Sequence, residues 1–556
     1  MPALQMKMVS SLEKCFLDEK IEDKQEKTEF TMFRNERLSF QVLYRNSQSE
    51  RKMVLYCPVR LSGTLAPYAT VRQVVNVPIT FPTLCADTEA DGEFLRTEPG
   101  LYPDLLRPMH YEHSIALPSR QLHSLWVDVE LPEDFEAGKY DLSISIYNRD
   151  KVELLGEVTG NVTVLAAQLP PQKLIHTEWF YTDCIANHYH TKAFSEKHWK
   201  YIESFLRTAV KNGINMILTP VFTPELDTYI GGERLTTQLV DIELVGDKKF
   251  AFGFDKLDRW IDLCLDCGVK YFEIAHFFTQ WGATAAPKIM VKVNGRLKKY
   301  FGWHTDAMGE EYTSFLSQFI PALVAEFKKK GVAQNCYYHV SDEPHLEHLE
   351  HYTACKNLIA PYLDEDHIID ALSSFEFYET GALKKPIPHT RGAHTFIDAK
   401  VPDLWVYYCG AHGTGGVSDR GIAMSLARTR ILGVQMYCYN IEGFLHWGYN
   451  FYNNNRSYEV VDPFGTTDGE FFAPAGDAFL VYPGTDGTAW ESLRINAMRE
   501  AVDDMRALSL YEEKFGREAT EQLIMEGTDG KLTFTEYPTD PGYLLNLREK
   551  IAKALA

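Results

Sequence analysis

The sequence predicts a multidomain protein of β and α/β type, with an N-terminal antiparallel β-sandwich followed by a (β/α)8 TIM-like barrel. Two observations carry this prediction. The first 165 residues contain strand-like segments and no helix of useful length, whereas strand-like and helix-like segments alternate from Leu174 onward. Between the two regions, Pro170 and Pro171 would interrupt any strand ladder. We therefore expect a β-sandwich domain at residues 1–170 and a barrel with a C-terminal helical tail at residues 171–556.

The sandwich prediction is clearest at residues 139–147. There Leu142, Ile144 and Ile146 alternate with polar side chains such as Ser143. A period of two places one row of side chains in a core and the other row in water. This pattern is typical of a half-buried strand.

Parallel strands joined by helices are predicted for the region after residue 173. The expected helices end at Gly213, Gly268 and Gly331, each of which stands just before a new strand. The expected strands are 174–182, 215–222, 271–278, 335–340, 368–372, 394–397, 404–408, 434–439 and 443–447. A number of units near eight favours a closed barrel. An open doubly wound sheet is the alternative, because the later units are irregular.

Charge and hydropathy exclude several classes of partner. The chain has 77 acidic and 56 basic residues and a formal net charge of -21. The electric field of this negative charge repels phosphate groups, so nucleic acid and anionic membranes are not expected partners. No segment reaches the roughly 20 apolar residues that cross a bilayer, and residues 1–16 lack an apolar run of signal-peptide length. We therefore expect a cytoplasmic protein without membrane insertion.

Chemistry-bearing residues gather where the predicted strands end, which is where a (β/α)8 barrel holds its active site. Two adjacent carboxylates, Asp342 and Glu343, follow one of these strands, and we predict that they are catalytic. Aromatic faces combined with amides and other polar groups are typical of a sugar site. The predicted substrate-binding residues are His276, Gln280, Trp281, Trp405, Tyr407, Tyr439, Asn440 and Trp447.

Some of these residues have a structural alternative. Asp342, Glu343 and Pro344 together also make a strong helix start, with a capping aspartate and a proline near the first helical position. A tryptophan at a strand end, such as Trp447, can equally belong to the core. Histidines at positions 345, 348 and 351 recur every three residues. At a helix start such a stripe is more often solvated than metal-bound, so we predict no metal site.

The adjacency of Asp342 and Glu343 limits the mechanism. Ordinary glycosidases place two carboxylates on opposite sides of the scissile bond, and neighbours in one turn cannot easily do so. They can serve a substrate-assisted reaction, in which the 2-acetamido oxygen of the sugar is the nucleophile. One carboxylate then orients the amide nitrogen, while the other protonates the leaving oxygen.

The segment Tyr338-His339-Val340-Ser341-Asp342-Glu343-Pro344 resembles the catalytic strand of glycoside hydrolase family 123, the β-N-acetylgalactosaminidases. Further segments similar to this family are Trp126-Val127-Asp128-Val129, Phe301-Gly302-Trp303, Gly443-Phe444-Leu445-His446-Trp447 and, near the C-terminus, Leu493-Arg494 with Arg499-Glu500. Ala501 stands where we expect a glycine, a departure that concerns helix packing rather than chemistry. The resemblance spans both predicted domains.

The resemblance implies that Asp342 assists the acetamido group and that Glu343 is the acid/base, with retention and an oxazolinium-type intermediate. It also implies no metal and no organic cofactor. The expected activity is an exo-β-N-acetylgalactosaminidase that releases terminal β-GalNAc from oligosaccharides or glycosphingolipid glycans. The alternatives are a β-N-acetylglucosaminidase or hexosaminidase of the same mechanism, and a non-catalytic glycan-binding protein on this scaffold. The sequence predicts no oligomeric state.

Overall fold

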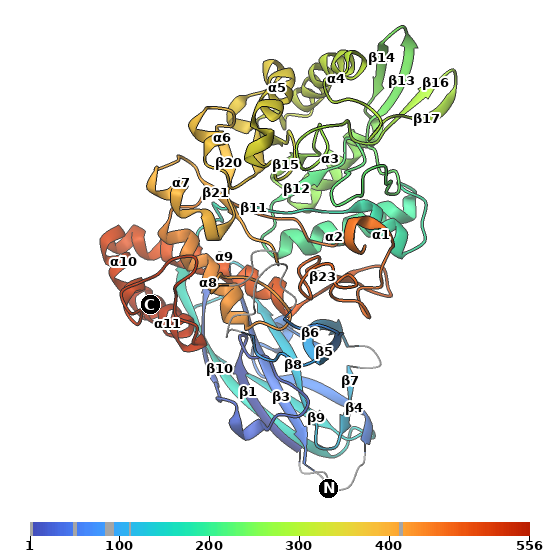
Figure 1. Cartoon of the computed structure of the whole chain (residues 1–556). Helices are drawn as coiled ribbons and strands as arrows, with labels where there is room; N and C mark the ends of the chain where they lie inside the picture. Colours follow the sequence, from blue (N-terminus) through green and yellow to red (C-terminus); the bar gives the residue numbers. More distant parts are fainter. Residues whose placement is uncertain (1–3, 48–52, 84–93, 110–112, 411–414) are drawn as a thin grey trace.

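Two five-stranded sheets form the N-terminal part of the protein, in a computed structural model that describes residues 4–47, 53–83, 94–109, 113–410 and 415–556 (Figure 1). The first sheet has the order β1 (Leu4–Ser10), β3 (Arg37–Asn46), β8 (Leu122–Glu130), β5 (Ala69–Ile79) and β6 (Gly100–Pro108). The second has the order β2 (Glu29–Arg34), β10 (Leu154–Gln168), β9 (Gly138–Tyr147), β4 (Met53–Ser62) and β7 (Ser114–Pro118).

The two sheets share one hydrophobic core, because alternate side chains of their strands point inward. Leu125 and Val127 of β8 meet Leu142, Ile144 and Ile146 of β9 in this core. The alternation predicted for residues 139–147 is confirmed. One strand pair departs from the prediction, since β2 and β10 run parallel.

A six-stranded parallel sheet lies in the second part of the chain. Its order is β18 (Cys336–Tyr338), β15 (Tyr271–Ile274), β12 (Met216–Thr219), β11 (Ile175–Glu178), β22 (Gly443–His446) and β21 (Trp405–Tyr407). On one side of β11 the strands follow in chain order, from β12 through β15 to β18. On its other side lies the last strand of the sheet, β22, and then β21, and every neighbouring pair is parallel. This sheet is a parallel half-barrel.

Two further strands, β19 (Ile369–Ala371) and β20 (Lys385–Ile387), form a separate parallel pair. Single parallel bridges, Tyr338 to Ile368 and His389 to Tyr407, are the described links between this pair and the half-barrel. The predicted (β/α)8 barrel therefore does not appear as one continuous sheet. These strands have only three residues each, and Pro386 in β20 has no N–H to donate to a ladder.

Helices follow the early strands as predicted. They are α2 (Glu196–Lys211), α3 (Asp255–Cys267) and α4 (Glu310–Lys329). Ser195 caps α2 by accepting a hydrogen bond from His198 N, and Gly268 ends α3 with the left-handed φ of 94° that favours glycine.

Two predicted strands are helices instead. Residues 394–397 lie in α7 (His394–Asp398), and residues 434–439 lie mostly in α8 (Leu426–Cys438). Every residue of α8 from Leu426 to Tyr437 is buried. A helix buried on all sides loses the 3.6-residue pattern and resembles a buried strand in sequence.

Two segments outside the predicted strands and helices form a small additional sheet. Its order is β14 (Lys249–Gly253), β13 (Asp241–Gly246), β16 (Ile289–Val293) and β17 (Arg296–Phe301). Figure 1 shows it projecting from the end of the molecule opposite the sandwich.

One helix, α9 (Leu493–Phe515), joins the sandwich to the α/β part through buried charges. Arg494 donates to both carboxylate oxygens of Asp104 in β6, at 2.9 Å each, and both side chains are inaccessible to solvent. Arg499 donates to the hydroxyl of Ser39 in β3 at 2.9 Å. The helical tail, α10 (Arg517–Met525) and α11 (Pro541–Leu555), packs on α9.

Among the helices of the described residues, we find none with both the length and the apolar character needed to span a bilayer.

The Arg494–Asp104 pair gives a stability prediction. Replacing Arg494 by Gln removes the positive charge that pairs with the buried Asp104 carboxylate, which should lower the unfolding free energy by about 3–5 kcal/mol. Urea denaturation followed by circular dichroism measures the loss. The control is Arg207→Gln, which removes half-exposed ion pairs to Glu203 and Asp266 and should cost at most about 1 kcal/mol. Equal effects of the two variants would contradict the structural role of Arg494.

Candidate active site

A cavity of about 440 Å³ opens at the carboxyl edge of the parallel strands. Parallel strands bring their carboxyl ends to one edge, so residues distant in sequence meet there. Six of the ten predicted site residues line the cavity: Gln280, Trp281, Asp342, Glu343, Tyr407 and Trp447. The expectation that site residues follow the ends of the strands, which we call the strand-end rule, therefore located much of the cavity wall.

The two adjacent carboxylates lie in a turn after β18 that neighbouring loops hold in place. Trp281 N donates to Asp342 O at 2.8 Å, and Glu343 N donates to Ala371 O at 3.0 Å. Glu343 has a φ of 42°, in the left-handed region that non-glycine residues rarely adopt. The following helical residues begin only at Leu346. The pair does not cap a helix, and the helix-start interpretation is wrong.

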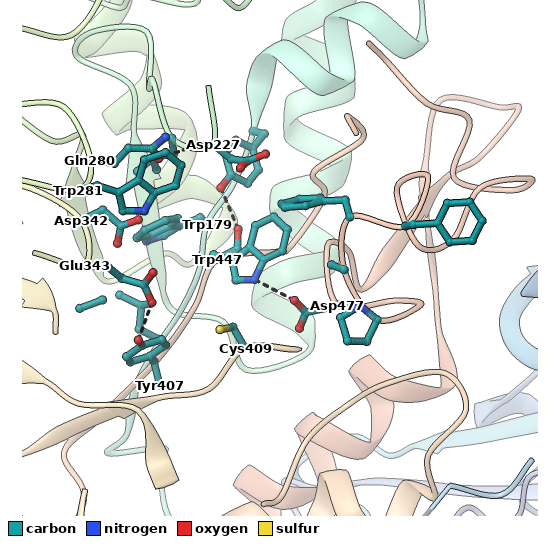
Figure 2. Close-up of a pocket in the computed structure, with 18 residues that line it drawn as sticks. Trp179, Asp227, Gln280, Trp281, Asp342, Glu343, Tyr407, Cys409, Trp447 and Asp477 are labelled. Atoms are coloured by element: carbon teal, nitrogen blue, oxygen red, sulfur yellow. Dashed lines mark hydrogen bonds between the residues drawn. The ribbon is translucent and has the colours of Figure 1, made fainter. Parts of the chain in front are cut away.

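The pair is electrostatically coupled. Burial raises the pKa of Asp342 well above its ordinary value, and the neighbouring Glu343 raises it further, while His339 lowers it. The Tyr407 hydroxyl donates to Oε1 of Glu343 at 2.6 Å. Figure 2 shows both carboxyl groups on the same side of the cavity. The proximity of the two acidic groups therefore disfavours a negative charge on Asp342.

A buried histidine lies behind this turn. His339 Nδ1 is 2.9 Å from Oδ1 of Asp370, and its Nε2 is 2.6 Å from Oε1 of Glu273. All three side chains are inaccessible to solvent. Burial alone would lower the pKa of His339, but the hydrogen bonds and charges of Asp370 and Glu273 outweigh it and raise the pKa to about 10. His339 is an imidazolium at neutral pH.

The two carboxylates beside His339 each hold a part of the cavity wall. Asp370 accepts from the backbone of Val340 at 3.1 Å and of Ser341 at 3.4 Å, directly before the turn of Asp342 and Glu343. Glu273 accepts from Nε1 of Trp179 at 2.7 Å, and Trp179 lines the cavity. The imidazolium therefore links the turn to an aromatic wall.

In the described part of the chain, one group of three residues has potential metal-ligand atoms within 4.8 Å of one another: His276, His339 and Asp370. A metal would need a free ring nitrogen on His339, and both nitrogens donate to carboxylates. His276 stacks on His339 with ring centroids 4.2 Å apart, and burial lowers its pKa well below the ordinary value. The set fits a charged and a neutral histidine in contact better than a metal centre.

A second buried network holds the opposite wall. Trp447 Nε1 donates to Oδ2 of Asp477 at 3.0 Å, and Figure 2 shows both residues across the cavity from the carboxylate pair. The fully buried Arg420 donates to both oxygens of Glu178 at 2.7 Å and to the Asp477 carbonyl at 3.2 Å. Buried charges that are paired and hydrogen-bonded fix geometry, so the orientation of Trp447 is set by this network.

Four predicted site residues do not line the cavity. His276 is buried and stacks on His339, behind the turn of Asp342 and Glu343. Trp405 begins β21, so it lies towards the amino edge of the sheet. Tyr439 ends α8 and donates its hydroxyl to Leu532 O at 3.1 Å, and Asn440 follows it. The last two were misplaced because residues 434–439 were predicted to be a strand.

The sequence analysis did not predict several other residues that line the cavity, among them Trp179, Asp227 and Asp477. Trp179 follows β11, and the strand-end rule would have found it. Asp227 and Asp477 lie in long loops without periodic patterning, so the sequence gives no signal for them. Asp227 N donates to Oε1 of Gln280 at 2.6 Å, and burial raises the pKa of the Asp227 carboxyl to about 6.

The model of the glycoside hydrolase 123 catalytic domain matches residues 179–511. The whole chain is similar in structure to a family 123 glycoside hydrolase from Clostridium perfringens, described for glycolipid glycan hydrolysis. The TM-score is 0.73 at 14% identity, covering 99% of this chain and 98% of that chain. At this identity the likeness establishes a common fold.

Two other solved structures align less well. A xyloglucanase from Bacteroides ovatus has a TM-score of 0.28 at 8% identity, covering 90% of this chain and 100% of its own. An endo-β-1,4-mannanase from Thermotoga petrophila has a TM-score of 0.33 at 13% identity, covering 60% and 77%. A comparison of the sequence with curated proteins gives no match.

The buried imidazolium predicts a pH-dependent stability. The pKa of His339 is about 10 in the folded protein and about 6.5 when unfolded. The stabilisation is therefore complete below pH 6.5 and is lost as the pH rises through 10. Between pH 7 and pH 10 the unfolding free energy of the wild type should fall by a few kcal/mol.

Urea denaturation at pH 7, 8.5 and 10 measures this slope. In His339→Gln the slope should flatten, and the stability at pH 7 should already be lower by about 3–5 kcal/mol, because two buried carboxylates lose their counter-charge. His304→Gln, at an exposed position, should retain the wild-type slope. A His339→Gln variant with an unchanged slope would show that His339 is not the buried cation.

Proposed function

The chain belongs to glycoside hydrolase family 123, and from this premise we propose that it is a retaining exo-β-N-acetylgalactosaminidase. The proposed substrate is terminal β-linked GalNAc on oligosaccharides or glycosphingolipid glycans. The Clostridium perfringens relative, described for glycolipid glycan hydrolysis, supports this substrate class. The cavity volume of about 440 Å³ lies in the range of small-ligand sites.

The observation that carries the mechanism is the position of Asp342 and Glu343 in one turn, on one wall of one cavity. A double-displacement or inverting enzyme needs its two carboxyl groups on opposite faces of the sugar. The two other carboxylates that line the cavity already accept hydrogen bonds, Asp477 from Nε1 of Trp447 and Asp227 from the backbone N of Arg456. The nucleophile that remains is the acetamido group of the substrate.

In the proposed reaction, Asp342 as carboxylate accepts the amide N–H and so directs the acetamido oxygen to C1. That oxygen forms the bond to C1 while the glycosidic bond breaks, and the leaving oxygen takes the proton of Glu343. The Asp342 carboxylate stabilises the positive oxazolinium ring. Glu343 then removes a proton from water, which attacks C1 while the bond from C1 to the acetamido oxygen breaks and restores the acetamido group. Two inversions give retention.

We assign sugar contacts to the four further predicted residues that line the cavity: Gln280, Trp281, Tyr407 and Trp447. Trp447 is the proposed stacking platform because its ring is fixed by Asp477. Tyr407 already bonds Glu343 in the absence of substrate, so its hydroxyl can support the acid or the acetamido oxygen.

The proposal also includes the architecture. We propose that β19 and β20, linked by single bridges to the half-barrel, complete a (β/α)8 barrel around the site. The catalytic domain would then span residues 171–556 and the β-sandwich domain residues 1–170, which braces the barrel through α9.

Aryl glycosides of β-GalNAc test the two roles. Glu343→Gln should lower kcat/KM by about 10²–10⁴ on phenyl glycosides, which need protonation, and much less on dinitrophenyl glycosides. Asp342→Asn should lower kcat/KM by about 10²–10³ on both kinds of glycoside, because the Asp342 carboxylate stabilises the cyclising transition state rather than the leaving group.

The matched control is Glu347→Gln, an exposed carboxyl four residues beyond Glu343, which should leave both rates unchanged. Full activity of Asp342→Asn would refute the role of that residue. Faster turnover of the β-GlcNAc glycosides by the wild type would refute the sugar preference, and turnover of neither sugar would refute the enzyme.

The pH profile tests the state of Asp342. Its pKa is raised above the ordinary aspartate value of about 3.9, and a protonated Asp342 cannot accept the amide N–H. As the pH falls, kcat/KM should therefore decline at a pH above that value. In Glu343→Gln, assayed with dinitrophenyl glycosides, one cause of the shift is gone, so the acid limb should move to lower pH. An acid limb that stays in place or moves upward contradicts the coupling of the pair.

A further inference from the structure

Large apolar side chains are exposed in the loops around the mouth of the cavity. We call the following set the apolar rim: Ile230 (81% exposed), Trp281 (38%), Tyr458 (61%), Val460 (53%) and Phe471 (60%). Trp281 and Phe471 also line the cavity. Exposed apolar residues that gather at one site mark a surface that meets a partner.

Specific contacts join the loops of the apolar rim. The ring of Tyr229, next to Ile230, stacks on Tyr458 with centroids 4.5 Å apart. Arg456 N donates to Oδ2 of the cavity residue Asp227 at 2.8 Å, and the Arg456 guanidinium lies 5.8 Å from the ring centroid of Trp281. The rim is therefore one surface continuous with the cavity.

The loop that carries Phe471 belongs to the same surface. Asn454 Nδ2 donates to Oε2 of Glu470 at 2.8 Å, which ties the segment of Tyr458 and Val460 to that of Phe471. Three loops distant in sequence thus form a continuous border.

Backbone strain is concentrated in the same loops. Six non-glycine residues have φ between 48° and 65°: Asp227, Trp281, Arg456, Ser457, Glu470 and Phe471. Such residues cost free energy and cluster where function requires them. Exposing apolar side chains on strained backbone does not stabilise the folded chain, so the gain must come from binding.

We propose that the apolar rim docks on an electrically neutral lipid surface that displays the glycan, so that the enzyme acts on glycolipids within a bilayer. The inference rests on the proposed function. With the terminal sugar in the cavity, its leaving group exits through the mouth, and the rim faces whatever carries that group. Aromatic and aliphatic side chains suit the interface of a bilayer.

The charges around the rim select the kind of lipid. The segments that carry the rim also contain the acidic residues Asp227, Glu459 and Glu470, and the whole chain carries a net charge of -21. This potential opposes anionic headgroups. Zwitterionic phosphatidylcholine with neutral glycolipid is therefore the expected surface.

The test compares one glycan in two forms, as the free oligosaccharide and as a glycosphingolipid in phosphatidylcholine vesicles. The variant assayed is the double substitution Ile230→Ser/Val460→Ser, which changes two rim residues that do not line the cavity. The ratio of vesicle to free-glycan kcat/KM should fall at least about ten-fold, because two exposed apolar side chains no longer enter the lipid surface. Co-sedimentation of this variant with the vesicles should fall in parallel.

The matched control is Val245→Ser/Leu297→Ser, which removes equally exposed side chains (62% and 64%) from the small projecting sheet and should keep the wild-type ratio. An unchanged ratio in the rim variant overturns the proposal. So does tighter sedimentation of the wild type with phosphatidylserine than with phosphatidylcholine vesicles, or an equal loss on a glycopeptide, which would indicate a protein partner. If the wild type did not hydrolyse even the free oligosaccharide, that result would instead refute the proposed function.

Discussion

The geometry of the active site depends on one buried ion set, the imidazolium of His339 between Asp370 and Glu273. Glu273 belongs to β15, Asp370 belongs to β19, and His339 directly follows β18. Each carboxylate then extends the constraint, Asp370 to the backbone before the turn of Asp342 and Glu343, and Glu273 to Trp179. A buried charge is tolerated only when its partners surround it, so the strands cannot shift without breaking the set, and the carboxylate pair is held with them.

This arrangement explains how two acids can occupy a buried turn. Burial and mutual repulsion oppose two negative charges at Asp342 and Glu343, while the imidazolium behind them favours one. The balance of these effects raises the pKa of Asp342 above its ordinary value. Across the cavity, Arg420 and Glu178 set Asp477 and Trp447 by the same principle. The site is thus built between two buried charge networks, and α9 anchors the whole unit to the sandwich.

The sequence predicted the parts of the fold that have a local signal. Alternation located the sandwich strands, glycine stops located the early helices, and the strand-end rule located Asp342 and Glu343. It did not predict the partners of His339, because Asp370 and Glu273 lie 31 and 66 residues away in the chain. The fully buried α8 was read as a strand, which misplaced Tyr439. Asp227 could not be foreseen because its loop has no periodic pattern.

The central claim is that the substrate supplies the nucleophile. The most direct measurement uses 4-nitrophenyl β-GalNAc glycosides whose N-acetyl group carries none, two or three fluorine atoms. Fluorine withdraws electron density from the amide oxygen without changing the leaving group. We expect kcat/KM of the wild type to fall steeply along the series, because the acetamido oxygen attacks C1. A flat series would contradict this account and would require an enzyme carboxylate as the nucleophile.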